Sequence, residues 1–201
     1  MTDYFTADLH LGHVNIAGHR GYSADHPGTV MHDDDVLDNI SATLRHNDRL
    51  FILGDLTNGG IAHEDEALLT LSRTSAARGY EIHFIAGNHD TCHPMRSKAH
   101  RRLRDFSRNL DSVASAGSLK IAGQRALLSH FCYDGDHTGG DRFTQWRPRD
   151  EGAIIIHGHT HAAEPVSYSE AGTLQICVSL EAHDMKPVSK ETLTHLIADH
   201  Q

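Results

Sequence analysis

Histidine, aspartate and asparagine recur at the ends of short apolar runs in this 201-residue sequence. The clearest case is IIIHGHTH, residues 154–161, in which three isoleucines lead into histidines at every second position. Imidazole, carboxylate and amide groups without thiolate suit manganese, iron, zinc or a similar divalent ion. Five such segments together offer seven candidate metal ligands: Asp8, His10, Asp55, Asn88, His130, His159 and His161.

The spacing of these residues favours a centre with two metal ions. Asp8 and His10 are two residues apart, as are His159 and His161, so in an extended chain both side chains of a pair project to the same face. Seven ligands exceed the needs of one ion, whereas two ions that share Asp55 would each receive four protein contacts. Two ions about 3.5–4 Å apart can lower the pKa of a water between them and clamp the oxygens of a phosphate. Three of the ligands follow a glycine, which allows a tight turn or a close backbone approach: Gly54, Gly87 and Gly158.

The elements that would position these residues alternate between strands and helices. Apolar runs predict buried strands at residues 4–9, 50–53, 82–86, 126–129, 153–156 and 174–179. Helical periodicity predicts helices at residues 32–48, 63–79, 94–110 and 187–200. The first of these helices would carry Asp33 to Asp35 in its first turn, and Gly79 and Ser189 would cap the second and fourth.

This alternation predicts an α/β layered fold whose first half is largely parallel. A hairpin expected at residues 118–130 suggests a more antiparallel second half, and residues 11–32 and 131–152 form two long loops. Ligands of open α/β sheets bind at the carboxyl ends of the strands. The five metal-capable segments should therefore meet in one crevice.

Composition narrows the class of protein. Lys and Arg number 18 against 27 Asp and Glu, a formal net charge of −9, which argues against a surface-wide nucleic-acid footprint but allows a local basic patch. Three cysteines without a C-x-x-C pair argue against a disulfide framework or a thiolate zinc site. We expect neither a signal peptide nor a membrane span, because the first ten residues, MTDYFTADLH, lack a basic segment followed by an apolar one and no apolar run approaches about 20 residues. We expect one domain, residues 1–201, in the cytoplasm and without membrane contact.

Five motifs in this order resemble those of the calcineurin-like metallophosphoesterases: D-x-H at residues 8–10, G-D at 54–55, G-N-H-D at 87–90, the histidine at 130 and G-H-x-H at 158–161. The segment DLHLGHVNI further resembles a small bacterial and bacteriophage branch of that family. The resemblance implies a four-layer α/β/β/α sandwich. It also implies a catalytic role for His89 near the phosphate, with Asp90 as a candidate to support its orientation.

The resemblance divides the ligands between two ions that share Asp55. It implies that one ion is held by Asp8, His10, Asp55 and His161. It implies that the other is held by Asp55, Asn88, His130 and His159. Manganese is the ion we expect, although iron, zinc, cobalt or nickel would suit the same ligands.

Further residues are candidates for substrate contact. His13 could hydrogen-bond a ligand carboxylate or the substrate, or it could stabilise a turn. Arg20 lies in the first long loop, and Trp146 and Arg149 lie in the second, where they could stack on a base and hold a phosphate or could serve as lid packing. The arginine-rich segment 96–108 is either a solvated helix face or an approach surface for phosphate or nucleic acid.

These features together predict a phosphodiesterase in which a metal-bridging hydroxide attacks phosphorus in line. The expected substrate is a small nucleotide, such as a 2′,3′-cyclic nucleotide, because the chain has little beyond its core to form a long groove. A phosphomonoesterase and a nuclease acting on RNA or DNA ends are alternatives. A non-catalytic scaffold of the same fold is a remote one, since all seven ligands and His89 are present.

Overall fold

The computed structural model describes residues 1–200 and contains two five-stranded sheets. The first sheet has the order β10-β1-β2-β3-β4. Its strands are β1 (Asp3–Thr6), β2 (Arg49–Ile52), β3 (Glu81–Ile85), β4 (Ser112–Ala114) and β10 (Val188–Ser189). Strands β1 to β4 are parallel and β10 pairs antiparallel with β1. The parallel first half predicted from the sequence is confirmed.

The second sheet is mixed, with the order β5-β6-β7-β9-β8. Its strands are β5 (Gly117–Ile121), β6 (Gln124–Leu128), β7 (Ile154–His157), β8 (Val166–Tyr168) and β9 (Leu174–Cys177). The β5–β6 hairpin is confirmed, and β8 also pairs antiparallel with β9. The three central strands β6, β7 and β9 run parallel, so the second half is less antiparallel than the sequence suggested.

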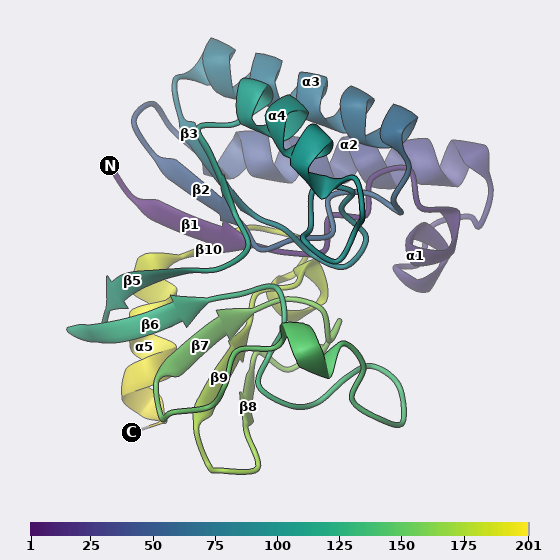
Figure 1. Ribbon diagram of the computed structural model, residues 1–201. Helices are drawn as coiled ribbons and strands as arrows, with labels where there is room; N and C mark the ends of the chain where they lie inside the picture. The colour runs from purple at the N-terminus through teal and green to yellow at the C-terminus, as the bar shows by residue number, and fades with distance from the viewer. Residues whose placement is uncertain (201) are drawn as a thin grey trace.

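Helices flank the two sheets, which confirms the predicted α/β/β/α class (Figure 1). They are α1 (Val14–His19), α2 (His26–Thr43), α3 (Ile61–Arg78), α4 (Ala99–Asn109) and α5 (Lys190–Asp199), with two short 3-10 turns, η1 (Thr144–Trp146) and η2 (Leu180–His183). Helices α2, α3 and α4 cover one face of the first sheet, and α5 contacts β10, β1 and β5 (Figure 1). No helix in the described part of the chain is long and apolar enough to cross a membrane.

Two apolar cores hold these layers together. The first lies under α2, α3 and α4 and includes Ile40, Leu68 and Phe106, which are all buried. The second lies between the two sheets, where Phe5 packs with Ile156. Strands β1 to β3 are parallel, and so are β6 and β7, so within each sheet the loops that follow these strands emerge at the same edge.

Two helices begin elsewhere than predicted. Helix α2 begins at His26 because the Asp25 side chain accepts a hydrogen bond from Gly28 N at 2.8 Å, with a proline in the first turn. Asp33 to Asp35 therefore lie in the middle of α2, not in its first turn, and the loop expected at 11–32 contains α1 and the start of α2.

Helix α4 begins at Ala99, not near Pro94. The preceding residues form turns, in which Arg96 N donates to His93 O and Ala99 N donates to Arg96 O. The Ser189 cap of α5 is confirmed, since its side chain accepts from Thr192 N. Gly79 ends α3 in the left-handed conformation, as expected (φ 75°).

Candidate active site

The carboxyl ends of the strands bring together metal-capable side chains from distant parts of the chain. Asp8, His10 and His161 form one group whose ligand atoms all lie within 4.8 Å of one another. Asp8, Asp55 and His130 form a second group under the same distance limit. Because Asp8 belongs to both groups, the two lie side by side. The crevice predicted at this edge of the sheets is therefore present.

The other two candidate ligands approach His130 from different loops. The Asn88 amide oxygen lies 3.0 Å from His130 Nε2. The His159 ring centroid lies 5.2 Å from that of His130, but His159 Nε2 contacts Asp136 Oδ2 at 3.1 Å. His159 Nδ1 is therefore the ring nitrogen left for a metal. Asp136 was not predicted, since it lies in the loop after β6 outside every motif, and with His137 and His159 it forms a third group of ligand atoms within 4.8 Å.

Five of the candidate ligands adopt the left-handed backbone conformation, which is uncommon for residues other than glycine. They are Asp8 (φ 56°), His10 (φ 49°), Asp55 (φ 54°), His159 (φ 70°) and His161 (φ 49°). Such residues cost about 1–3 kcal/mol each and persist only where the surroundings enforce them. Asp8 N donates to Gly54 O and His10 N donates to Asp55 O, both at 3.0 Å. The turns after β1 and β2 thus hold each other in place.

The glycines beside the ligands leave room that a side chain would fill. A Cβ on Gly87 would lie 2.4 Å from Asp55 Oδ1, and one on Gly54 would lie 2.5 Å from His130 Nδ1. Gly54 also has a positive φ of 89°. A Cβ on Gly158 would lie 2.8 Å from Asp8 Oδ2. The close approach expected at these three glycines is confirmed.

The polar atoms of the cluster fit divalent cations. Asp8 Oδ1 is buried and has no hydrogen-bond partner among the described residues, whereas Asp8 Oδ2 accepts from His159 N and from the Ser179 hydroxyl. The Nε2 atoms of His10 and His161 lie only 3.2 Å apart. A carboxylate oxygen without a donor beside two facing imidazole nitrogens is an arrangement that a cation stabilises.

Hydrogen bonds outside the cluster orient two of its histidines. His130 Nδ1 donates to Leu53 O and His161 Nδ1 donates to Glu181 Oε1, each at 2.8 Å. Because a carbonyl and a carboxylate can only accept, Nε2 is the ring nitrogen that each histidine presents to the cluster. Glu181 also accepts from Arg20 Nη2 at 2.8 Å. Glu181 was not predicted in this role, because it follows the last predicted strand with no ligand motif.

Charge and burial shift the pKa of several members. Burial raises the pKa of Asp55 to about 7, although the neighbouring His89 opposes this shift. Burial would also raise the pKa of Asp8, but the charges of surrounding histidines, His161 first, hold that pKa below its usual range. Burial would lower the pKa of His161, but Asp8 and Glu181 raise it to about 9. Cations would therefore compete with protons in this cluster.

His89 lies at the mouth of the cluster. Its side chain is 37% exposed, and its backbone N donates to Asp55 Oδ1 at 2.8 Å. Since His89 Nδ1 donates to the backbone oxygen of Asn58 at 3.2 Å, its Nε2 is the nitrogen that can carry a second, exchangeable proton. That atom lies 3.9 Å from Asp55 Oδ2.

Asp90 does not contact the His89 ring, contrary to the expectation that it supports that ring. Its carboxylate accepts from the backbone N of Gly87 (2.6 Å), Asp55 (2.9 Å) and Leu56 (3.0 Å). Adjacent side chains diverge, so Asp90 turns inward while His89 turns outward. Burial raises the pKa of Asp90 to about 8. Asp90 thus joins the loops after β2 and β3 and positions the ligands they carry.

The four candidates for substrate contact divide into two pairs. His13 and Arg20 line the cavity at the cluster. The Arg20 side chain is only 3% exposed and donates to Asp8 O, Leu9 O and Glu181, so it holds the loop after β1. Trp146 lies outside this cavity, 37% exposed, and Arg149 extends into solvent and pairs with Glu151 at 3.8 Å.

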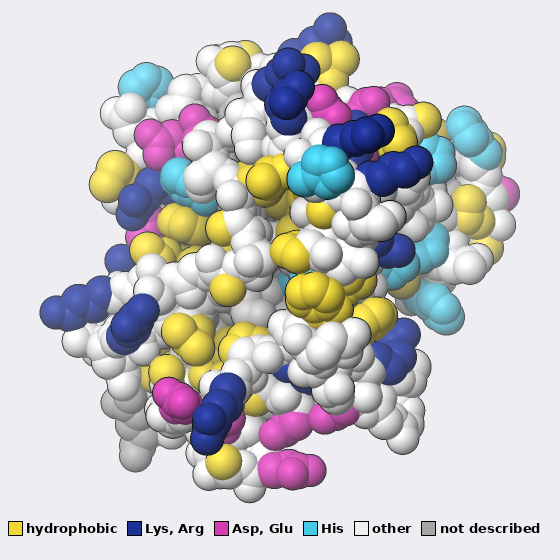
Figure 2. Space-filling view, viewed as in Figure 1, with side chains coloured by type: hydrophobic (Ala, Val, Ile, Leu, Met, Phe, Trp, Pro, Cys, Tyr) yellow, Lys and Arg dark blue, Asp and Glu magenta, His cyan; other side chains and the backbone are white. Residues whose placement is uncertain are grey.

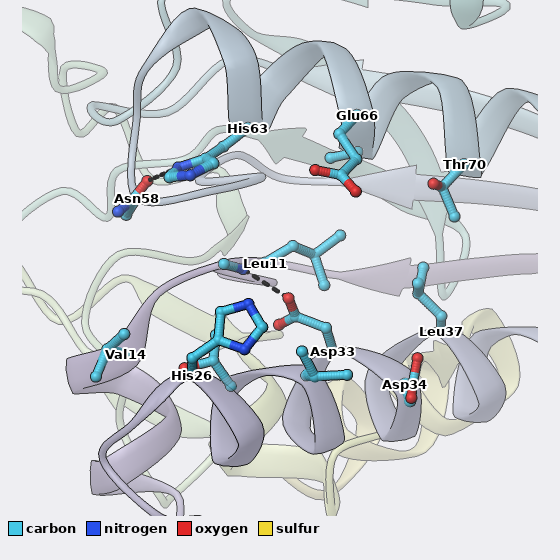
Figure 3. Close-up of a pocket in the computed structure, with 14 residues that line it drawn as sticks. Leu11, Val14, His26, Asp33, Asp34, Leu37, Asn58, His63, Glu66 and Thr70 are labelled. Carbon is cyan, nitrogen blue, oxygen red and sulfur yellow. Dashed lines mark hydrogen bonds between the residues drawn. The ribbon is translucent and has the colours of Figure 1, made fainter.

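Two cavities adjoin this region. One of about 420 Å³ opens over the cluster and is lined by histidines that include His10, His89 and His161. A larger one of about 620 Å³ lies between α2 and α3. Figure 3 shows that acidic side chains of α2 and α3 border it, and Asp33 accepts a hydrogen bond from Gly12 N at 2.8 Å. Carboxylates repel a phosphate, so the smaller cavity is the better phosphoester site.

Comparisons with known proteins agree with this site. The sequence matches the Calcineurin-like phosphoesterase superfamily domain over residues 8–178. It is 38% identical over 194 residues to the Gene 66 protein of Mycobacterium phage D29, covering 93% of this chain and 92% of that protein. It is 36% identical over 166 residues to the Gene 66 protein of Mycobacterium phage L5, covering 79% and 77%.

A solved structure shares the fold. The protein of unknown function AQ665 from Aquifex aeolicus matches with a TM-score of 0.66 and 23% identity, over 97% of this chain and 98% of that one. At this level of identity the likeness supports the fold alone.

Proposed function

The chain belongs to the calcineurin-like phosphoesterase superfamily, and on that premise we propose that it hydrolyses a small phosphodiester, most favourably a 2′,3′-cyclic nucleotide. Metal-dependent phosphoester hydrolysis follows from the family. The cavity of about 420 Å³ lined by His10, His89 and His161 supports the choice of a small substrate, since pockets of this size suit small ligands. Manganese is the proposed ion.

The proposed ligand sets follow the two groups at Asp8 and Asp55. Asp8, His10, Asp55 and His161 would hold one ion. Asp55, Asn88, His130 and His159 would hold the other. Two bound ions supply an activated water and neutralise the charge of the phosphate. The protein's own part is to orient these ligands: His130 donates a hydrogen bond to Leu53 O, and His161 donates one to Glu181.

His89 is the proposed source of the proton for the leaving oxygen. The carbonyl of Asn58 fixes Nδ1 as a donor, so a proton on Nε2 faces the cavity. General acid catalysis of this kind contributes about 10²–10⁴-fold in rate. Arg20 and His13 contact the cluster from the same cavity wall and support the shape of the site.

The substrate class can be tested with protein purified in the presence of manganese. We would compare aryl phosphate monoesters and diesters with 2′,3′- and 3′,5′-cyclic nucleotides at equal concentration. We expect turnover of diesters, with 2′,3′-cyclic nucleotides preferred. Turnover of monoesters alone would overturn the diesterase proposal, and preference for 3′,5′-cyclic nucleotides would overturn the choice of substrate.

The role of His89 can be separated from metal binding. His89→Ala should retain bound metal, measured by elemental analysis, and lose about 10²–10⁴-fold in kcat. His195→Ala, which removes an exposed histidine of α5, is the matched control and should retain both. Unchanged kcat in His89→Ala would show that another group supplies the proton.

A further inference from the structure

Positive side chains gather on one exposed face at and before α4. This α4 basic face consists of Arg96, Lys98, Arg101, Arg104 and Arg108, all of which are exposed. The last three are spaced so that they share one side of the helix. Figure 2 shows Lys and Arg side chains over α4. In a protein of net charge −9, such a concentration of positive charge is local and not a property of the whole surface.

Few carboxylates offset this charge. Buried Arg102 takes Glu64 and Asp65 as ion-pair partners and also binds Asp105 at 2.9 Å. Asp105 is likewise the partner of Arg108, at 3.7 Å. Within residues 1–200, no carboxylate oxygen lies within 4.0 Å of the charged nitrogens of Lys98, Arg101 or Arg104. These three cations are therefore free to meet an anion from solution.

The α4 basic face is continuous with the candidate active site. Arg96 Nη2 donates to the backbone oxygen of Asn88, a proposed metal ligand. His93, between the two, packs edge-to-face against Trp146 with ring centroids 5.2 Å apart. Phe131 contacts both His93 (5.9 Å) and His159 (4.9 Å). A row of rings thus leads from the cluster to the exposed Trp146, and His93 in this row accepts a backbone hydrogen bond from Arg96, the first residue of the basic face.

An exposed aromatic ring combined with unpaired guanidinium groups suits single-stranded nucleic acid, because rings stack on bases and cations follow the phosphates. We propose that the preferred substrate is a single-stranded RNA whose 3′ end carries a 2′,3′-cyclic phosphate. The terminal cyclic phosphate occupies the cavity at the cluster, Trp146 stacks on a base next to it, and the phosphates on the 5′ side lie along the α4 basic face. This inference rests on the proposed function.

The reaction is a hydrolysis and needs no further reactant. The oxygen of a water forms a bond to phosphorus, and one of the two phosphorus–oxygen bonds to the ribose breaks. The released ribose oxygen takes a proton from His89, which regains one from the water consumed. The product is an RNA with a terminal phosphomonoester, and electrons and atoms balance.

The experiment compares two substrates that share the reactive group. One is a mononucleoside 2′,3′-cyclic phosphate, and the other is an oligoribonucleotide of about eight nucleotides with the same terminus. We expect kcat/KM for the oligonucleotide to exceed that for the mononucleotide by about tenfold near 50 mM salt. Two phosphate contacts should reduce this advantage about sevenfold at 200 mM salt.

Matched variants locate the surface. Arg101→Glu/Arg104→Glu should abolish the advantage of the oligonucleotide and leave the mononucleotide within about twofold. Lys120→Glu/Arg125→Glu changes the net charge equally on the β5–β6 hairpin, where the two exposed residues are cross-strand partners, and should preserve the advantage. Trp146→Ala should reduce the advantage in the same direction as the α4 variant.

The outcomes separate this inference from the proposed function. An oligonucleotide no better than the mononucleotide, or an equal loss in both double variants, would overturn the RNA proposal while leaving the phosphodiesterase intact. If neither cyclic phosphate is hydrolysed, the proposed function fails. Binding of a fluorescent oligoribonucleotide with a 3′ hydroxyl, measured by anisotropy, then still decides whether the α4 basic face binds RNA. Equal affinity of the wild type and Arg101→Glu/Arg104→Glu would reject it.

Discussion

Glu181 illustrates how one residue outside the motifs can orient a proposed metal ligand, His161. Its carboxylate holds His161 Nδ1 at 2.8 Å and is itself held by Arg20. Partners of this kind fix the ring orientation of a histidine and raise its basicity. Neither Glu181 nor Asp136 was identified from the sequence, because each contacts its histidine only through the folded chain. The seven candidate ligands were chosen from their positions at strand ends and from their spacing, and the fold brings them to one edge of the sheets.

Glu181→Gln should lower the affinity of the protein for Mn²⁺ about 10–100-fold. The amide keeps the shape and can still accept a hydrogen bond from Arg20, but it lacks the charge that supports His161. Titration calorimetry of the two proteins would measure this difference. Glu164→Gln, an exposed carboxylate with the same change of charge, serves as the control and should bind as the wild type does. Equal affinities in all three proteins would contradict the role given to Glu181.

His93 should make stability depend on pH. Burial lowers its pKa from 6.5 to about 4, and the nearby charges of His130 and Arg96 act in the same direction. The folded state thus favours neutral His93. The contribution of His93 to the free energy of unfolding is therefore complete above pH 6.5 and is lost as the pH falls toward 4. Between pH 6.5 and 4, the unfolding free energy of the wild type should fall by about 1–3 kcal/mol more than that of His93→Asn.

Urea unfolding at several pH values, with a chelator present, would measure the His93 effect. His100→Asn replaces an exposed histidine of α4 and should leave the pH dependence unchanged. A wild type and His93→Asn with parallel profiles between pH 4 and 6.5 would refute the expectation.

Among the elements, α2 shows what periodicity can and cannot locate. Its buried Val36 and Ile40 predicted a helix correctly, but residues 26–31 bury only Gly28 and Thr29 and were assigned to a loop. The same helix holds the segment after β1, since His32 contacts Arg20 at 2.9 Å and Asp33 accepts from Gly12 N. A local apolar pattern contains no sign of such contacts. In contrast, Asp25 followed by Pro27 is a sequence signal for the start of a helix.

Removal of the α2 cap should destabilise the protein. Asp25→Ala leaves Gly28 N without its acceptor and should lower the unfolding free energy by about 1 kcal/mol. Asp25→Asn keeps an oxygen acceptor and should retain most of that stability. Denaturant unfolding of both variants would measure the difference. The cap would be of no importance if the alanine and asparagine variants unfolded alike at the wild-type midpoint.

For the whole molecule, the sequence predicted the parallel first sheet and the edge at which the loops meet, because strand and helix alternate there. It could not predict the parallel arrangement of β6, β7 and β9, since β7 and β9 are separated by β8 and no local pattern records which strands become neighbours. It also could not predict the left-handed backbone of five candidate ligands, a conformation supported by hydrogen bonds between turns. Residue types thus identify the candidate site residues, whereas the order of the strands determines which of them meet.

That global arrangement should make folding stability depend on metal. Packing buries Asp8 Oδ1 without a hydrogen-bond donor among the described residues, and the desolvation of this oxygen is a cost that only the folded state bears. Cations that bind the folded state alone stabilise it by about 2.7 kcal/mol at one hundred times the dissociation constant. A chelator should therefore lower the melting temperature of the wild type, and Mn²⁺ should restore it.

Asp55→Ala should show no such restoration because Asp55 belongs to both proposed ligand sets. Asp38→Ala, an exposed aspartate of α2, should show the full effect, and so should Arg101→Glu/Arg104→Glu, whose changes lie on α4. If the wild type melted at the same temperature with and without Mn²⁺, the folded protein would accommodate the buried Asp8 carboxylate without cations, and the expectation would be wrong.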